Sequence, residues 1–513
     1  MNAPACPKCG KTMASNGSTP GGKRRWRCQP NGVFCYTTTS AAGAERSKRS
    51  QTTPIFARTL GKATTRFLVT GAQNATPVHK GFWASLKRAA EHLSAELLVV
   101  PLRYKNPTSR WTASQANEEV WAEEVQPFLY NRRVALHKNL VLIGDVKTQP
   151  TASSPLTGFD AITHGESALL AHTKLQLRTV PTPQRTLPKI LSTTGACTQL
   201  NYTDSKAGAL GRFHHSTGAA LVEMRGKRFH LRQLNAEHDG AFQDLSTIYG
   251  PEGITENVAI AGLVLGDVHV DSIDPAVDRA TFGAGGIADR TNPGAIVFHD
   301  LLDSYAVNPH HDGNPFNAYA KHRTGRNDIR AEVLRAIEYA ITRAPRVGFV
   351  VSSNHDDMLR RWIVAKDWRA DPANMQFYLE TAAMMIAQTR LTAAGMTCPS
   401  PFALWAQRLA PELRVLNADE SFRIAGIECG LHGDRGPNGV RGSRMNLRRI
   451  GVRSVIGHSH SPGIEEGCYQ TGTSTYLRLE YNGGCSSWLN THCAIYVSGK
   501  RTLINIIDGE WHV

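Results

Sequence analysis

Five short apolar segments in the second half of the chain are each followed at once by a polar cluster. These segments span 258–265, 295–298, 347–351, 422–427 and 452–456. A short apolar run bounded by polar and turn residues is typical of a buried strand, and helical spacing between some of the runs predicts alternating strands and helices. Sites in such sheets lie beyond the carboxyl ends of the strands, so we expect the five clusters to meet.

The clusters consist of residue types that bind divalent cations or transfer protons. In chain order they are Asp267 with His269, Asp300, Asn354 with His355 and Asp356, His432, and His458 with His460. Residues two apart in an extended chain point the same way, so the first and last pairs can each reach one cation. A carboxylate can bridge two cations, whereas an imidazole nitrogen binds one. Each cluster alone could be a core histidine or a helix cap, but five in succession are not expected by chance.

The order of these clusters resembles the motifs of the calcineurin-like metallophosphoesterase superfamily, which read D-x-H, G-D-x-x-D, G-N-H-D/E, H and G-H-x-H. The match covers residues 256–465. The resemblance implies that Asp267, His269 and His460 hold one metal, that Asn354, His432 and His458 hold a second, and that Asp300 bridges both. It also implies that His355 is the general acid and that Asp356 steadies it. His299 and Ser353 stand where the family has glycine.

The expected fold is α/β, with a metallophosphoesterase β-sandwich flanked by helices over 256–513. An α/β accessory domain is expected over 63–255, because apolar strands alternate there with helical spacing. The predicted strands span 67–69, 97–102 and 140–143, and the predicted helices span 82–93 and 117–130. Residues 39–62 are rich in Ser, Thr, Ala and basic side chains, which predicts a flexible basic linker.

Residues 1–38 contain four cysteines in two pairs, Cys6 with Cys9 and Cys28 with Cys35. Thiolates are ligands that zinc favours, and four can close a tetrahedral site that supplies folding energy to so short a segment. The pattern resembles the small zinc ribbons of some transposases and phage DNA enzymes. The six residues between Cys28 and Cys35 depart from the usual tight second pair. The alternative is four free cysteines.

The chain carries a net charge of +15, and residues 1–60 hold ten Lys or Arg against one acidic residue, Glu45. A concentrated basic end favours a polyanionic partner, with DNA the leading candidate. Between the cysteine pairs, the expected phosphate contacts are Lys23, Arg24, Arg25 and Arg27. The alternative is a solvated basic tail. No apolar run is long enough to span a membrane, so we expect a cytoplasmic protein without a membrane partner.

The predicted function is a metal-dependent DNase that hydrolyses phosphodiesters by a two-metal mechanism. Mixed nitrogen and oxygen ligands accept manganese, iron or zinc, and the superfamily's nucleases favour manganese. The sequence "HDLLD" at 299–303 is similar to the second motif of SbcD-type recombination nucleases. The stretch "VTGAQNATPVHKGFW" at 69–83 and the segment from 99 resemble phage-encoded metallophosphoesterases, some of which are pre-early proteins that degrade host DNA.

This second resemblance implies action on DNA in the cytoplasm of the host cell. Such nucleases are often oligomeric, so a homo-oligomer is an expectation. Two alternatives stay open at this point: a phosphomonoesterase acting on a protein or nucleotide, and a non-catalytic DNA-binding protein on a phosphoesterase scaffold.

Overall fold

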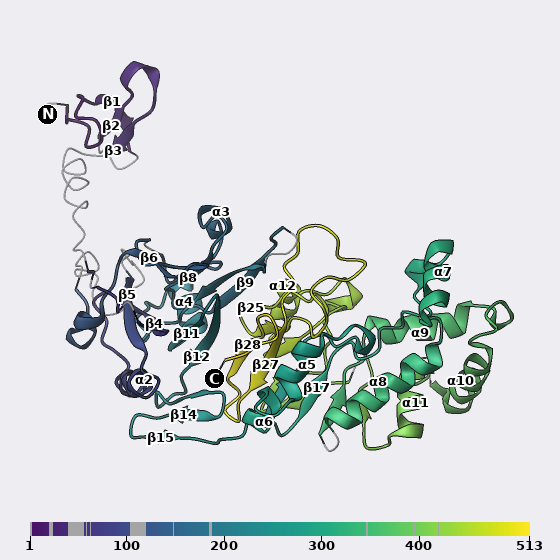
Figure 1. The fold of residues 1–513 in the computed structure, drawn as a ribbon. Coiled ribbons are helices and arrows are strands. Elements are labelled where there is room, and N and C mark those ends of the chain that lie inside the picture. The colour runs from purple at the N-terminus through teal and green to yellow at the C-terminus, as the bar shows by residue number, and fades with distance from the viewer. Residues whose placement is uncertain are drawn as a thin grey trace. The chain divides into compact units, whose positions relative to one another are not determined.

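The structure is a computed structural model of the 513-residue chain. It describes residues 3–19, 24–38, 56–57, 59–61, 63–102, 120–146, 148–183, 187–344, 347–392, 395–418 and 420–512. The chain divides into two compact units, Met1–Phe56 and Ala57–Val513 (Figure 1). Among the described residues, no helix combines the length and the apolar character that crossing a membrane requires.

The first unit is a small antiparallel sheet in the order β1-β2-β3. Its strands are β1 (Ala14–Ser18), β2 (Arg24–Cys28) and β3 (Tyr36–Thr38), and the one-turn helix η1 (Pro30–Gly32) joins the last two. Its core consists of Cys6, Met13, Trp26 and Cys28. Four side chains are a small core, and a unit of this size generally needs a further source of stability such as a bound metal.

The second unit contains a mixed sheet of ten strands. In spatial order the strands are β22 (Arg423–Ile424), β23 (Ile427–Glu428), β24 (Ser454–Ile456), β26 (Cys468–Gln470), β25 (Gly463–Glu465), β9 (Gln176–Val180), β10 (Lys189–Thr193), β8 (Ser167–Leu170), β7 (Leu140–Ile143) and β6 (Arg133–His137). Strands β25 and β9 pair antiparallel, with Ile464 opposite Leu177. The two halves of the chain therefore share this sheet.

A six-stranded sheet carries most of the polar clusters. Its order is β21 (Arg414–Val415), β18 (Gly348–Val350), β17 (Ile296–Phe298), β16 (Gly262–Val264), β27 (Thr491–Ile495) and β28 (Arg501–Asn505). The first four run parallel to one another, and β27 is antiparallel to both of its neighbours, β16 and β28. The carboxyl ends of β16, β17 and β18 therefore lie along one edge.

Two smaller sheets and a hairpin complete the strands of this unit. They are β12-β11-β4-β5, β13-β14-β15 and β19-β20. Their bounds are β4 (Arg66–Gln73), β5 (Glu96–Leu102), β11 (Gly218–Arg225), β12 (Arg228–Asn235), β13 (Phe242–Asp244), β14 (Thr247–Tyr249), β15 (Ile254–Thr255), β19 (Arg390–Thr392) and β20 (Gly395–Thr397).

The described residues of the second unit form α-helices of four to fifteen residues. They are α2 (Lys80–His92), α3 (Phe159–Ile162), α4 (Lys206–His214), α5 (Pro275–Phe282), α6 (Ile287–Thr291), α7 (Pro315–Thr324), α8 (Ile329–Arg343), α9 (Asn354–Ala365), α10 (Met375–Gln388), α11 (Pro401–Leu409) and α12 (Arg444–Leu447). Helices α5 and α6 lie beside the strands β17 and β27 in Figure 1.

Two apolar cores define the layers. One core joins the ten-stranded, six-stranded and four-stranded sheets, which contribute Val455, Val264 and Val69 respectively. The other lies between the opposite face of the six-stranded sheet and helices α8, α9 and α11, and includes Phe298, Ile337 and Phe402. The strand alternation that sends Val264 to one core and Leu263 to the other follows from the two-residue period of a strand. The predicted α/β class is confirmed.

Most predicted elements are present, and two are wrong. The predicted helix 117–130 begins outside the described residues, and its described part holds only the short 3-10 helix η2 (Glu123–Phe128), in which Pro127 lacks the N–H that an α-helix requires. The predicted strand 422–427 is a hairpin, because Ala425 and Gly426 have positive φ and turn the chain. The predicted division of the second unit near residue 255 stays a prediction.

Candidate metal centres

The polar clusters after the strands of the six-stranded sheet are joined through their backbones. Val268 N–H donates to the carbonyl of His299, and His269 N–H donates to the carbonyl of Asp300, with 2.9 and 2.7 Å between the heavy atoms. Asp267 N–H donates to Gly472 O at 3.1 Å, just after β26. These bonds hold the loops after β16 and β17 of the six-stranded sheet next to the loop after β26 of the ten-stranded sheet.

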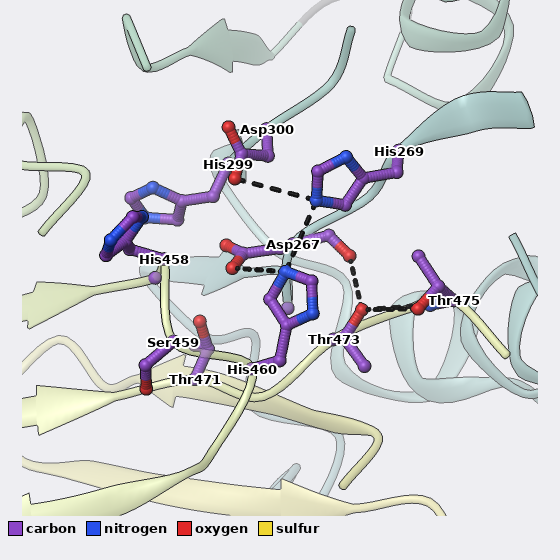
Figure 2. A network of polar contacts seen from close by, with 12 residues as sticks. Asp267, His269, His299, Asp300, His458, Ser459, His460, Thr471, Thr473 and Thr475 are labelled. Atoms are coloured by element: carbon purple, nitrogen blue, oxygen red, sulfur yellow. Dashed lines mark hydrogen bonds and ion pairs between the residues drawn. The ribbon is translucent and has the colours of Figure 1, made fainter. Parts of the chain in front are cut away.

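Figure 2 shows four side chains facing one another, those of Asp267, His269, Asp300 and His460. His460 Nε2 lies 3.2 Å from Asp267 Oδ2 and 3.2 Å from His269 Nε2. His269 Nε2 lies 3.6 Å from Asp300 Oδ2. All four residues are buried. Two carboxylates and two imidazoles therefore converge on one buried point, which is a donor set that divalent metals accept.

A second group of side chains shares Asp300 with the first. His432 Nε2 lies 3.1 Å from Asp300 Oδ2, and the rings of His432 and His458 are 5.2 Å apart. Nδ1 of His458 lies 3.1 Å from Oδ1 of Asn354. The ligand atoms of Asp300, His432 and His458 lie within 4.8 Å of one another. All seven predicted ligands thus lie in one cluster with Asp300 between two groups, and their role as ligands stays a prediction.

Several buried atoms of this cluster have no hydrogen-bond partner of acceptable geometry. They are both carboxylate oxygens of Asp267, Asp300 Oδ1, His299 Nε2, His432 Nε2 and His460 Nδ1. A buried polar atom without a partner costs about 1–3 kcal/mol. His432 Nε2 lies close to a carboxylate oxygen of Asp300 but is misaligned for a hydrogen bond. Two atoms that bind the same cation are close to each other in this way without being hydrogen-bonded. The donor set therefore fits bound metal ions.

The backbone at the cluster adopts conformations that non-glycine residues rarely take. His269, Asp300, His458 and His460 all have φ between 41° and 76°. Each such residue costs about 1 kcal/mol or more, and such strain concentrates at functional sites. A Cβ at Gly457 would lie 2.2 Å from Asp267 Oδ1, so only glycine fits before His458. The strained turns aim the polar side chains inward.

The electrostatics of the cluster are dominated by buried carboxylates. Burial alone would raise the pKa of Asp300, but the imidazoles of His432 and His355 hold it well below its usual value. Burial alone would lower the pKa of His432, yet Asp300 and Asp267 raise it to about 9. The pKa of His269 is likewise raised to about 9 against burial, by Asp303 and Asp300. The carboxylates thus create a potential that attracts positive charge.

The structure gives His355 a different partner from the predicted one. Its Nδ1 lies 2.6 Å from the carbonyl oxygen of Asp303 and 3.5 Å from Oδ1 of the same residue. Asp356, the predicted partner, accepts instead from Ser353 N–H in a capping box at the start of α9. The expectation that Asp356 steadies His355 is therefore corrected. Sequence reasoning missed Asp303, although its place in "HDLLD" was visible.

His299 occupies the position that is glycine in the resembled motif. It is buried, and its Nδ1 lies 3.4 Å from His432 Nδ1. Its ligand atom and those of Asp267 and His432 lie within 4.8 Å of one another. Burial lowers the pKa of His299 to about 4, so this imidazole is neutral near pH 7. The side chain of His299 therefore lies within the cluster, next to Asp267 and His432.

The four cysteines of the first unit converge. Cys6 Sγ lies 3.7 Å from Cys35 Sγ, and Cys9 Sγ lies 3.4 Å from Cys28 Sγ. All four sulfur atoms lie within 4.8 Å of one another. Tetrahedral zinc with Zn–S bonds near 2.3 Å separates its sulfur atoms by about 3.8 Å. The four thiols therefore have the spacing of a zinc site, including Cys35 despite its longer spacing in sequence.

Three of the four basic residues predicted to contact DNA lie on strand β2, and Lys23 lies outside the described residues. Arg24 and Arg25 are exposed. The guanidinium of Arg24 lies 5.8 Å from the Trp26 ring centroid, and that of Arg27 lies 5.7 Å from the Phe34 ring centroid. The strand therefore presents cations with neighbouring aromatic rings.

The fold and the two sites define an α/β protein with a group of four cysteines that can bind zinc and a buried Asp/His cluster that can bind divalent metals. A comparison with curated proteins finds Protein A1 of Escherichia phage T5, which is 31% identical over 467 residues, or 87% of this chain and 82% of that protein. The chain belongs to the family of this phage protein. No protein-family model matches it, and no solved structure matches it.

Proposed function

We propose that this chain is a metal-dependent DNase of the calcineurin-like metallophosphoesterase superfamily, acting on DNA in the cytoplasm of a phage-infected host. The observation that carries the proposal is the convergence of Asp267, Asp300 and His460 from three separated segments on one buried point. Kinship with a phage protein at 31% identity supports a phage role.

The cluster is proposed to hold two divalent cations, with manganese as the preferred metal. One cation would be held by Asp267, His269 and His460. The other would be held by Asn354, His432 and His458, and Asp300 would contribute to both. Bound there, two cations would neutralise the phosphodiester charge and lower the pKa of a nearby water molecule. Asp267 Oδ1 and Asp300 Oδ1, which are buried without a hydrogen-bond partner, support this assignment.

His355 is proposed to protonate the leaving oxygen. Its Nδ1 is held by Asp303, which leaves Nε2 as the nitrogen that can face substrate. The carboxylate of Asp303 also lies 3.2 Å from His269 Nδ1, so one residue orients both imidazoles. Arg326 stacks on Tyr305 and lies 3.6 Å from Asp303 Oδ2, which holds that carboxylate in place. A general acid must be oriented in this way to act in the transition state.

A nuclease assay with plasmid DNA across manganese, magnesium, zinc and iron tests the proposal. Asp300→Ala and His458→Ala should each abolish cleavage while retaining the thermal unfolding midpoint. Lys227→Ala, in the exposed turn between β11 and β12, is the matched control and should cleave normally. Cleavage by both metal-site variants at the intact rate would exclude the centre. Hydrolysis of a nucleotide monophosphate but not of plasmid would favour a phosphomonoesterase instead.

The first unit is proposed to bind zinc through its four cysteines and to contact DNA through Arg24, Arg25 and Arg27. Arginines on one strand contact phosphates without reading sequence. Removing residues 1–56 should weaken DNA binding and flatten its dependence on salt, while hydrolysis of a small aryl phosphodiester continues. Equal loss of both activities would show that the first unit is no separate binding module.

A further inference from the structure

A cavity of about 1280 Å³ lies in the second unit, apart from the Asp/His cluster. It is lined by the end of α4 with Phe213, the residues after β12 with Glu237, and the starts of β24 and β28 with Arg453 and Arg501. Small-molecule sites typically measure about 300–1,000 Å³. The cavity therefore has room for a ligand larger than one nucleotide.

The cavity and the Asp/His cluster lie at opposite ends of strand β24. Arg453, which lines the cavity, directly precedes the strand, whereas His458 follows it in the cluster. Five residues of extended chain span on the order of 15 Å. A ligand in the cavity therefore occupies a site distinct from the metal centre.

One wall of the cavity concentrates positive charge. Arg501 is 6% exposed, and its Nη1 donates to the carbonyls of Ser454 and Gly467 at 2.7 and 2.9 Å. Its guanidinium stacks 4.1 Å from the Tyr469 ring centroid. Among the described residues, no carboxylate lies within ion-pair distance of Arg501. A buried arginine is ordinarily paired with an anion, so its charge is left for a ligand to meet.

Two further cations stand beside Arg501. Arg453 Nη2 lies 3.7 Å from where a Cβ on Gly499 would be, which places this guanidinium against the turn that carries Lys500. Burial and the charges of Arg453 and Arg501 lower the pKa of Lys500, with Glu237 opposing them. Within the part of the chain that the structure describes, neither Arg453 nor Lys500 forms an ion pair. Mutual repulsion of this kind is relieved by an anion.

The lining also includes an aromatic side chain from the end of α4. The Phe213 side chain is 80% exposed and its ring lies 4.9 Å from that of His214. Lys174, the remaining cation of the lining, is already paired with Glu466 at 3.1 Å, and Glu466 also contacts Arg448. Arg453, Lys500 and Arg501 are therefore the Lys and Arg side chains of the lining that form no ion pair among the described residues, and the same lining holds an exposed aromatic ring.

We propose that this cavity binds the phosphate groups of a nucleotide or of a single DNA strand, with Arg453, Lys500 and Arg501 on the phosphates and Phe213 stacked on a base. Arginine and lysine bind phosphate through charge-assisted hydrogen bonds, and an aromatic side chain stacks on a base whatever its identity. Binding here requires no metal, so the site goes beyond the proposed hydrolysis and does not depend on it.

Equilibrium dialysis of the full-length chain in buffer without added divalent metal tests this site. The probes are thymidine monophosphate and a labelled thymidine tetranucleotide. Arg453→Gln combined with Lys500→Met should weaken binding of at least one probe about tenfold or more, and Phe213→Ala should weaken the same probe less. Lys227→Met removes a lysine outside the cavity and should bind as the unaltered chain does.

The outcomes separate the two ligands. Loss of tetranucleotide binding assigns the site to a strand, loss of monophosphate binding alone assigns it to a free nucleotide, and unchanged binding of both probes by the double variant overturns the proposal. Thermal unfolding checks that the double variant folds. The double variant should hydrolyse an aryl phosphodiester in manganese buffer at the rate of the unaltered chain. If neither the unaltered chain nor any variant hydrolyses it, the result counts against the proposed metal centre and not against the phosphate site.

Discussion

His492 accepts a hydrogen bond from the backbone N–H of Gly266, with 2.9 Å between Nδ1 and N. Its Nε2 lies 2.8 Å from Thr281 Oγ1, and Thr281 donates its hydroxyl to the Val277 carbonyl at 2.8 Å. This arrangement requires the tautomer with hydrogen on Nε2. A neutral imidazole on β27 therefore anchors the residue that directly precedes Asp267.

His492→Phe should lower the free energy of unfolding by about 1–3 kcal/mol, because the buried N–H of Gly266 would lose its acceptor. Urea unfolding monitored by tryptophan fluorescence measures the change. His322→Phe, on the exposed face of α7, is the matched control and should alter stability little. Equal stability of His492→Phe and the unaltered chain would mean that the Gly266 N–H finds another partner.

Protonation of buried histidines should make stability fall in mild acid. Burial lowers the pKa of His172 from 6.5 to about 4. The unfolded chain then binds more protons than the folded one between these values, so stability fully present above pH 6.5 is lost as the pH falls toward 4. One pKa unit corresponds to about 1.4 kcal/mol, which makes the loss up to about 3 kcal/mol.

The His172→Gln variant isolates this contribution. At pH 7.5 the variant should have a lower free energy of unfolding than the unaltered chain, because the hydrogen bond between His172 Nε2 and the Gln149 carbonyl is altered. The difference in free energy of unfolding between the two chains should shrink as the pH falls below 6.5. Thermal unfolding across this pH range measures the difference. His322→Gln is the control, and its difference from the unaltered chain should not change with pH. A gap that widens in acid would mean that His172 is protonated in the folded chain.

Asp303→Asn should reduce phosphodiester hydrolysis about ten- to hundredfold, as removal of an orienting carboxylate typically does. The reason is that Asp303 contacts both His355 and His269. Asp356→Asn keeps an acceptor oxygen for the Ser353 N–H and should retain most activity. Steady-state rates at saturating manganese distinguish the two. The reverse ranking would restore Asp356 as the residue that steadies His355.

Cys28→Ser should reduce the zinc content of the purified chain by about one atom, because four thiolates close the proposed tetrahedral site. Release of zinc by a mercurial reagent, followed with a colorimetric chelator, measures it. Cys398→Ser, a cysteine outside the four, is the control. Identical zinc content in the two variants would show that the four-cysteine group holds no zinc.

Local sequence pattern predicted part of the candidate cluster. Apolar segments followed by Asp267, Asp300 and Asn354 predicted the ends of parallel strands, which lie at one edge of the six-stranded sheet. His458 follows β24 of the ten-stranded sheet, so its approach to Asp300 depends on how the two sheets pack. The preference of zinc for thiolates likewise predicted that the four cysteines of the first unit lie together. It misjudged 422–427, where the positive φ of Ala425 and Gly426 turned an apolar run into a hairpin, because periodicity does not report backbone turns.

Residue type and local spacing were sufficient to predict the α/β class, the residues of the candidate cluster and the four-cysteine group. Three features emerge only in the folded chain: the contact between Asp303 and His355, the sheet that both halves of the chain share, and the cavity that Arg453 and Arg501 both line. These features depend on pairing between segments far apart in the chain, for which local periodicity carries no signal.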